Sequence, residues 1–125
     1  MAERSTEAAT IAGRRWHGRI LLIFASPGDA RLQRQRRIVA DAATAMAERQ
    51  LAAVIVSGDA VDGASDKAAA LRRRYAVPEG RFAVILIGKD GGEKLRAADP
   101  VPAETLFATI DAMPMRRNEM AAGRR

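Results

Sequence analysis

The sequence contains no cysteine, which excludes disulfide bonds, thiol catalysis and zinc sites built on cysteine ligands. His17 is the only histidine, so a metal centre with several histidine ligands is excluded as well. Aromatic residues make up only 4% of the 125 residues, and the core must therefore consist of aliphatic side chains. No apolar run approaches the roughly 20 residues that a membrane-spanning helix requires. We therefore expect one domain with an aliphatic core, and neither a bound metal nor a cofactor.

Residues 1–15 carry Glu3 and Glu7 and lack the apolar stretch of a signal peptide. This pattern predicts a cytoplasmic protein, whereas a chain from which a leader had been removed would be periplasmic or secreted. We expect a flexible segment over residues 1–15, a folded domain over residues 16–117 and a basic tail over residues 118–125.

The formal charge of +6 comes mainly from arginine, since the chain has 18 arginines and three lysines. Basic clusters attract phosphate backbones, and weak nucleic-acid binding through Arg31, Arg34 and Arg72–Arg74 is one hypothesis. No aromatic residue inside these clusters offers a stacking surface for bases. Solvated helix faces in an arginine-rich bacterial protein are therefore the favoured interpretation, and nucleic acid is a disfavoured partner.

Four segments have the pattern of β-strands. Residues 19–25, 51–56 and 82–87 are apolar runs of strand length, typical of strands buried on both faces of a sheet. The turn Lys89–Gly92 contains an Asp-Gly pair, a strong hairpin signal, and leads into a fourth strand at residues 93–96.

Helical periodicity links these strands. Leu32, Val39 and Met46 recur every seven residues in a predicted helix over residues 30–50, with Asp29 as its N-cap. Shorter helices are predicted from Ser65 or Asp66 to Tyr75 and over residues 103–113, whereas residues 115–125 show no clear periodicity.

The element order predicts an α/β fold of the thioredoxin-like type. The first two strands, joined by a long helix, should be parallel with a right-handed crossover. The hairpin adds two antiparallel strands and gives a four-stranded mixed sheet in the order 2-1-3-4. Both faces of this sheet should be covered by helices.

Several segments resemble the bacterial DUF4174 domain, a thioredoxin-like module of unknown function. The resemblance covers roughly residues 15–120 and is most specific in Ile110-Asp-Ala-Met-Pro-Met-Arg-Arg117. The other segments that carry it are Arg19–Ala25, Val84–Gly92, Lys94–Arg96 and Leu106-Phe107. The resemblance implies a fold but no activity, because the family has no agreed function.

Thioredoxin-like enzymes place their reactive group after the first strand, at the start of the first helix. The corresponding residues here contain no thiol, and alanine stands where a cis-proline would precede the third strand. We interpret this region as a vestigial redox site, formed by Ser26, Pro27, Gly28, Asp29, Arg31 and Ala83. Disulfide exchange is excluded, and a Ser26–His17 pair fails because the two residues lie at opposite ends of a strand. The loop acids Asp59 and Asp62 are expected to cap turns rather than bind a metal.

The predicted topology directs the Asp111–Arg117 segment back to the hairpin turn and to the segment that precedes the first strand. One hypothesis is structural: Asp111 pairs with Arg19, Lys89 or Arg117, while Met113 and Met115 pack beneath. The alternative is a binding surface for an acidic peptide or a small anion. The candidate residues are Arg15, Lys89, Asp90, Lys94, Arg96, Asp111, Arg116 and Arg117, with Lys94 and Arg96 expected on one strand face.

The leading functional hypothesis is a non-catalytic binding or scaffold module that recognises a protein or anionic partner. A thiol-independent enzyme that acts on an anionic substrate at the start of the first helix is the second hypothesis. A closed surface at residues 26–31 would argue against the second.

Overall fold

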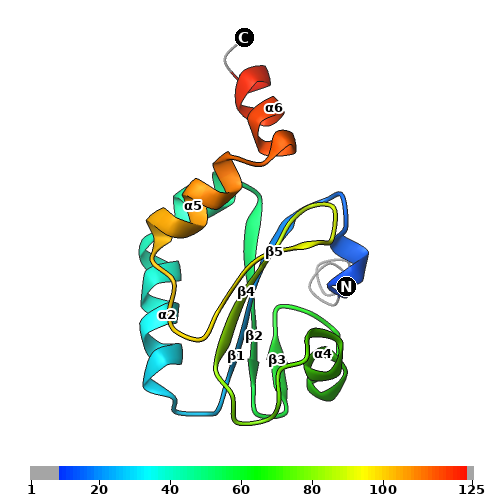
Figure 1. Cartoon of the computed structure of the whole chain (residues 1–125), viewed down its shortest axis with the longest axis vertical. Helices are drawn as coiled ribbons and strands as arrows, with labels where there is room; N and C mark the ends of the chain where they lie inside the picture. The colour runs from blue at the N-terminus through cyan, green and yellow to red at the C-terminus, as the bar shows by residue number, and fades with distance from the viewer. Residues whose placement is uncertain (1–8, 124–125) are drawn as a thin grey trace, which may run out of the picture.

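The computed structural model describes residues 9–123. Its five strands form one mixed sheet in the order β3-β2-β1-β4-β5 (Figure 1). β1 and β2 are parallel, and every other neighbouring pair is antiparallel. This arrangement confirms the predicted thioredoxin-like class and the order of the four predicted strands. The strands span Arg19–Ala25 (β1), Leu51–Ser57 (β2), Ala60–Asp62 (β3), Ala83–Ile87 (β4) and Glu93–Ala97 (β5).

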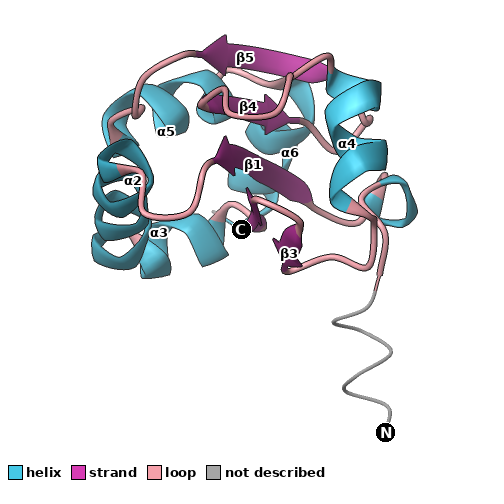
Figure 2. Cartoon of the chain, turned by 90° about the horizontal axis from the view of Figure 1, so that it is seen from below, coloured by secondary structure: helices cyan, strands magenta, loops and turns pink. Residues whose placement is uncertain are grey.

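The helices cover both faces of the sheet, as predicted (Figure 2). α2, α3 and α5 pack on one face and α4 packs on the other, whereas α6 projects beyond the end of the sheet (Figure 1). The helices span Ala12–Arg14 (η1, a 3-10 turn), Ala30–Asp41 (α2), Ala43–Glu48 (α3), Ala68–Tyr75 (α4), Ala103–Asp111 (α5) and Pro114–Gly123 (α6). In residues 9–123, no helix is both long enough and apolar enough to cross a membrane.

β1 is the centre of the core, and all seven of its residues are buried. Successive side chains of a strand point to opposite faces, so β1 contributes to two separate clusters. Leu22 and Phe24 pack with Leu71 of α4, whereas Leu21 and Ile23 belong to the cluster that includes α2, α3 and α5. The unbroken apolar run in the sequence therefore reflects burial on both faces.

Gln35 of α2 is a fully buried polar residue that fixes the loop before α5. Its amide nitrogen donates to the Val101 carbonyl at 3.1 Å, and its amide oxygen accepts from the Val101 N–H at 2.7 Å. One side chain thus satisfies both backbone groups of Val101, which is buried, and sets the position from which α5 starts.

Four elements differ from the sequence-based expectation. β3 is an additional edge strand, because Gly58 adopts a φ of 60° and turns the chain back after β2. The predicted helix over residues 30–50 is interrupted at Ala42, whose ψ of 17° departs from helical geometry. Residues 114–123 form helix α6 instead of an irregular tail. The helix expected from Ser65 or Asp66 begins at Ala68, since the Asp66 carboxylate accepts from the Ile11 N–H at 2.8 Å.

Candidate functional site

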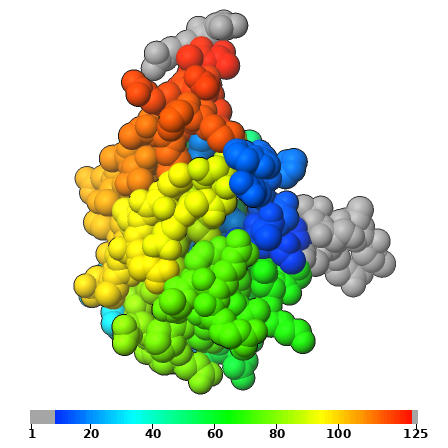
Figure 3. All heavy atoms as spheres, turned by 45° about the vertical axis from the view of Figure 1, so that its right-hand side comes forward, coloured from blue at the N-terminus to red at the C-terminus, as the bar shows by residue number. Residues whose placement is uncertain are grey.

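Three segments far apart in the sequence meet at the end of the sheet where β1 begins. The Trp16 N–H donates to the Lys89 carbonyl at 2.5 Å, which joins the segment before β1 to the hairpin turn. Met113, Pro114 and Met115 line a small cavity of about 70 Å³ together with residues 88–90 and Lys94. Figure 3 shows the N-terminal segment, the hairpin and the start of α6 in contact on one face. We call this region, residues 14–19, 88–94 and 111–119, the hairpin pole.

Asp111 lies at the pole but pairs with other residues than expected. Its carboxylate accepts from the Arg49 guanidinium at two distances of 3.0 Å and from Arg116 at 3.2 Å. The expected partners Arg19, Lys89 and Arg117 are therefore wrong. The hydrogen bonds from Arg49 are the main cause that holds the pKa of Asp111 below its ordinary value, with a smaller contribution from Arg116. Arg49 is itself positioned over the Phe107 ring of α5, 4.3 Å from its centroid.

Arg116 is a structural anchor more than an exposed donor. Its side chain is only 13% exposed, and it also donates to the Glu48 carbonyl at the end of α3, at 3.2 Å. Arg117, the next residue, is exposed. The two neighbouring arginines that the sequence groups together thus have different surroundings.

Two cations are buried beneath α6. The Arg19 side chain is fully buried and that of Lys89 is 9% exposed. Both bind the Glu119 carboxylate: Arg19 contributes two nitrogens at 3.3 Å each, and Lys89 contributes its Nζ. Lys89 also donates to the Gln50 side-chain oxygen. Burial alone would raise the pKa of Glu119, but the hydrogen bonds and charges of Lys89 and Arg19 together hold it below the ordinary value.

The other side of the pole is open to solvent. Trp16 is 55% exposed and Met115 is 38% exposed, and both lie beside residues 88–90. Arg15 is exposed and places its guanidinium 5.0 Å from the centroid of the Trp16 ring. Trp16 has a φ of 73°, a left-handed conformation that is costly for a bulky side chain. The backbone thus holds a large apolar side chain in water at the cost of local strain.

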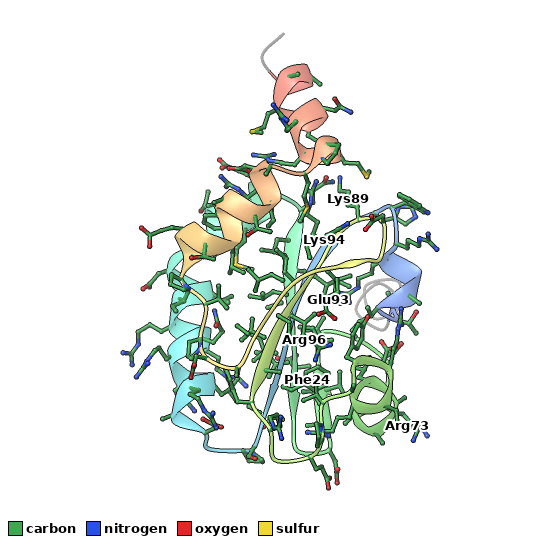
Figure 4. The ribbon with its side chains drawn as sticks, in the orientation of Figure 1. Phe24, Arg73, Lys89, Glu93, Lys94 and Arg96 are labelled. Carbon is green, nitrogen blue, oxygen red and sulfur yellow. The ribbon has the colours of Figure 1, made fainter. Side chains whose placement is uncertain are left out.

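The expectation that Lys94 and Arg96 share one strand face is wrong. A β-bulge shifts the register, so that Leu86 pairs with Leu95 but Ile87 pairs with Glu93. Arg96 consequently donates to the Tyr75 carbonyl of α4 and to Glu93, on one face of the sheet. Lys94 instead binds Asp90 at 2.9 Å and lines the cavity at the start of α6, as Figure 4 shows by its position near Lys89. Asp90 has a lowered pKa, mainly because it accepts from the Gly92 N–H and then from Lys94.

The residues expected to form a vestigial redox site lie at the opposite end of β1. Asp29 caps α2, as predicted, by accepting from the Arg31 N–H at 2.8 Å. The Arg31 guanidinium returns to the same carboxylate, with its closest nitrogen at 2.9 Å, and lies 5.0 Å from the centroid of the Phe82 ring. The Asp29 carboxylate thus accepts hydrogen bonds from both the backbone N–H and the guanidinium of Arg31. Ser26, Pro27 and Gly28 form the turn before this cap, and Ala83 pairs with Phe24 in the sheet.

A larger pocket of about 290 Å³ lies between the end of α4 and the start of β4, and it has an apolar lining apart from two arginines. Its lining residues are Ala76, Val77, Pro78, Arg81, Phe82, Ala83, Arg96, Ala97 and Ala98. None of residues 26–31 lines this pocket, although Ala83, which was expected in the vestigial redox site, does. Within residues 9–123, no group of three or more acidic or histidine side chains could hold a metal ion.

The arginine clusters on α2 and α4 do not form one surface. α2 packs on one face of the sheet and α4 on the other, so Arg34 and Arg73 belong to opposite sides of the molecule. Arg72 donates to the Gly58 carbonyl at 2.8 Å and is partly buried. A continuous phosphate-binding track through both clusters is therefore not available.

Sequence reasoning missed Glu119, Gln50 and Arg49. Glu119 falls in the segment expected to be a tail, although Pro114 and Gly123 mark the ends of a helix as these residues often do. That signal could have revealed α6. Nothing in the sequence identifies which cations Glu119 meets, because that depends on where α5 directs the next helix.

Solved structures with the same fold are similar to this chain at low sequence identity. A secreted disulfide oxidoreductase of Mycobacterium tuberculosis is 17% identical, with a TM-score of 0.58, and the match covers 90% of this chain and 100% of that chain. Thioredoxin-2 of the malaria parasite is 18% identical with a TM-score of 0.58, over 77% and 84% of the two chains. A thioredoxin-fold protein from Helicobacter pylori is 13% identical with a TM-score of 0.58, over 85% and 72%.

These likenesses concern the fold, since the reactive cysteines of a disulfide oxidoreductase have no counterpart in a chain without cysteine. No curated protein has significant similarity to the sequence. A family profile described as a domain of unknown function, DUF4174, matches residues 10–119, and the chain belongs to this family.

Proposed function

We propose that this protein is a non-catalytic, thioredoxin-like binding module that recognises an acidic segment of a partner protein through the hairpin pole. The observation that carries the proposal is the exposure of Trp16 in a strained backbone conformation. A strained residue persists only where the surrounding structure enforces it, and such residues concentrate at functional sites. Here the enforcing contact is the hydrogen bond from the Trp16 N–H to Lys89.

The composition of the exposed surface supports a protein partner. Tryptophan, methionine and arginine are enriched in protein interfaces, and tryptophan and arginine dominate their binding energy. Trp16 and Met115 supply exposed apolar surface next to the hairpin turn. Arg15 is exposed over the Trp16 ring, and Arg117 is exposed on α6 two residues after Met115. The cations favour an acidic partner, in line with the formal charge of +6.

The test is a selection of random peptides against the full chain, followed by affinity measurements on the enriched peptides. We expect enriched peptides to be acidic and to bind about tenfold or more weakly to Trp16→Ala, because loss of a hot-spot side chain typically costs 2 kcal/mol or more. Arg117→Ala should weaken binding less, and more at low salt than at high salt. Trp16 is the only tryptophan, so its fluorescence reports binding directly in the wild-type chain.

Arg73→Ala is the matched control, because Arg73 is also an exposed arginine but lies on α4, away from the hairpin pole (Figure 4). It should leave peptide affinity unchanged. Enriched peptides without acidic character, or equal losses in the Arg73 and Arg117 variants, would refute recognition through the pole.

A further inference from the structure

The buried part of the hairpin pole has an excess of positive charge. Arg19 and Lys89 share the single carboxylate of Glu119, which Arg116 also approaches at 3.8 Å. Arg49 and Arg116 share the carboxylate of Asp111. Burial of a charge is costly unless an opposite charge or hydrogen bonds compensate it. The Arg19 Nε is buried without a hydrogen-bond partner among residues 9–123. This end of the sheet is therefore suited to bind an anion, and the Nε–H of Arg19, its most buried cation, is available to donate to one.

Glu119 occupies this anion site, but its two hydrogen bonds from Arg19 are long. The guanidinium of Arg19 faces both carboxylate oxygens, but at 3.3 Å each, whereas charge-assisted bonds of this kind are normally about 2.7–2.9 Å long. A carboxylate that is not constrained by the path of α6 could come closer. The Glu119 side chain is also 26% exposed, so solvent reaches the site beside it.

Helix α6 is held mainly by these polar contacts. None of its residues is buried, and it projects from the body of the molecule (Figure 1). Segments with few buried apolar contacts open at low free-energy cost. The turn at Ala112 and Met113, between α5 and α6, is the natural point about which the helix would move.

We propose that Arg19, Lys89 and Gln50 form a carboxylate-binding site for a glutamate side chain of the acidic partner, and that the chain's own Glu119 occupies it in the free protein. α6 then acts as an internal competitor that is displaced on binding. This inference rests on the proposed acidic partner and adds a buried recognition point to the exposed one. Each cation keeps one acceptor when Glu119 leaves. Lys89 donates to the Gln50 side-chain oxygen, and Arg19 donates to the Arg49 carbonyl at 2.7 Å.

The experiment uses acetate as the probe and the full chain with Glu119→Ala. The substitution empties the site without touching the cations, so acetate should bind there and raise the melting temperature in a saturable way relative to chloride at equal ionic strength. Acetate should also shift the side-chain NMR signal of the Arg19 Nε–H. Its affinity for the variant should exceed that for the wild type by about tenfold or more, because Glu119 keeps most wild-type molecules closed.

Glu79→Ala is the control, since Glu79 is an exposed carboxylate in the loop before β4. It should respond to acetate as the wild type does. Equal acetate responses in all three proteins, or a Glu119→Ala response that survives Lys89→Met, would overturn the proposal. If Glu119→Ala proves too unstable, Glu119→Gln, which removes the charge and keeps the shape, should give a smaller response of the same kind. The assay needs no partner, so its failure leaves peptide recognition through Trp16 intact.

Discussion

The neighbouring residues Arg116 and Arg117 offer a direct test of how α6 is held. Arg116 is 13% exposed and donates to Asp111 and to the Glu48 carbonyl. Arg117 is exposed, and no ion pair of its side chain occurs among residues 9–123. The same substitution by alanine, one residue apart on one helix, should therefore have unequal effects. Arg116→Ala should loosen α6 and Arg117→Ala should not.

The magnitude follows from the contacts that are lost. Hydrogen bonds to charged groups contribute about 1.5–3 kcal/mol each. Both bonds of Arg116 are long, at 3.2 Å, and Asp111 keeps its bonds to Arg49. We therefore expect a loss of about 1–2 kcal/mol, which corresponds to a change of about 5- to 30-fold in an opening equilibrium. For Arg117→Ala we expect less than about 0.5 kcal/mol, as for surface substitutions in general.

Amide hydrogen exchange of α6 is the appropriate measurement. Since α6 buries no residue, most of the loss should appear as local opening, and the amides of β4 serve as an internal reference. In Arg116→Ala, the α6 amides should exchange about 5- to 30-fold faster while those of β4 change little. Equal protection of α6 in the two variants would refute the assignment of Arg116 as an anchor. Faster exchange throughout the chain would refute the local character of the contact.

Three further predictions concern stability. Gln35→Met should lower the free energy of unfolding in urea by about 2–4 kcal/mol, since it leaves two buried backbone groups of Val101 unpaired; Gln33→Met on the exposed side of α2 is the control, and equal losses would contradict the reasoning. The pKa values of Asp111 and Glu119 lie below their ordinary values of 3.8 and 4.5, so their stabilisation of α6 is present above those values and is lost as pH falls through the lower, folded-state pKa values. Exchange of α6 amides, corrected for its intrinsic pH dependence, should therefore rise from about pH 4.5 downward, and a pH-independent protection would count against these ion pairs. Trp16→Gly should be more stable than Trp16→Ala by about 1 kcal/mol, because glycine accepts a φ of 73° without strain; identical melting temperatures would show that the residue carries no strain.

The fold could be predicted from sequence where a single physical signal determines the element. β1 and β4 are buried on both faces, and this requirement produces the unbroken apolar runs at residues 19–25 and 82–87. The hairpin of β4 and β5 could be predicted from its Asp-Gly turn. β3 has only three residues and depends on the turn at Gly58, so its sequence carries little strand pattern. The interruption at Ala42 involves neither glycine nor proline and leaves the helical periodicity almost unchanged.

The convergence at the hairpin pole could be predicted because it depends on strand direction and helix length alone. Which side chains pair with one another at the hairpin pole could not be predicted. Asp111 meets Arg49 because α3 ends beside α5, and Glu119 meets Arg19 because α6 lies at the end of the sheet where β1 begins. Both facts depend on packing angles. The face of Lys94 was mispredicted for a local reason, since the bulge beside Ile87 breaks the alternation of side chains.

The same bulge has a consequence for how any partner can approach. β5 is an edge strand, and an edge strand with free backbone groups invites another chain to extend the sheet. β5 carries Glu93, Lys94 and Arg96 within five residues and has an irregular register. Charged side chains and a bulge both discourage strand addition. The β5 edge is thus protected from strand addition and aggregation, which agrees with the proposed recognition of a partner by side chains at the end of the sheet.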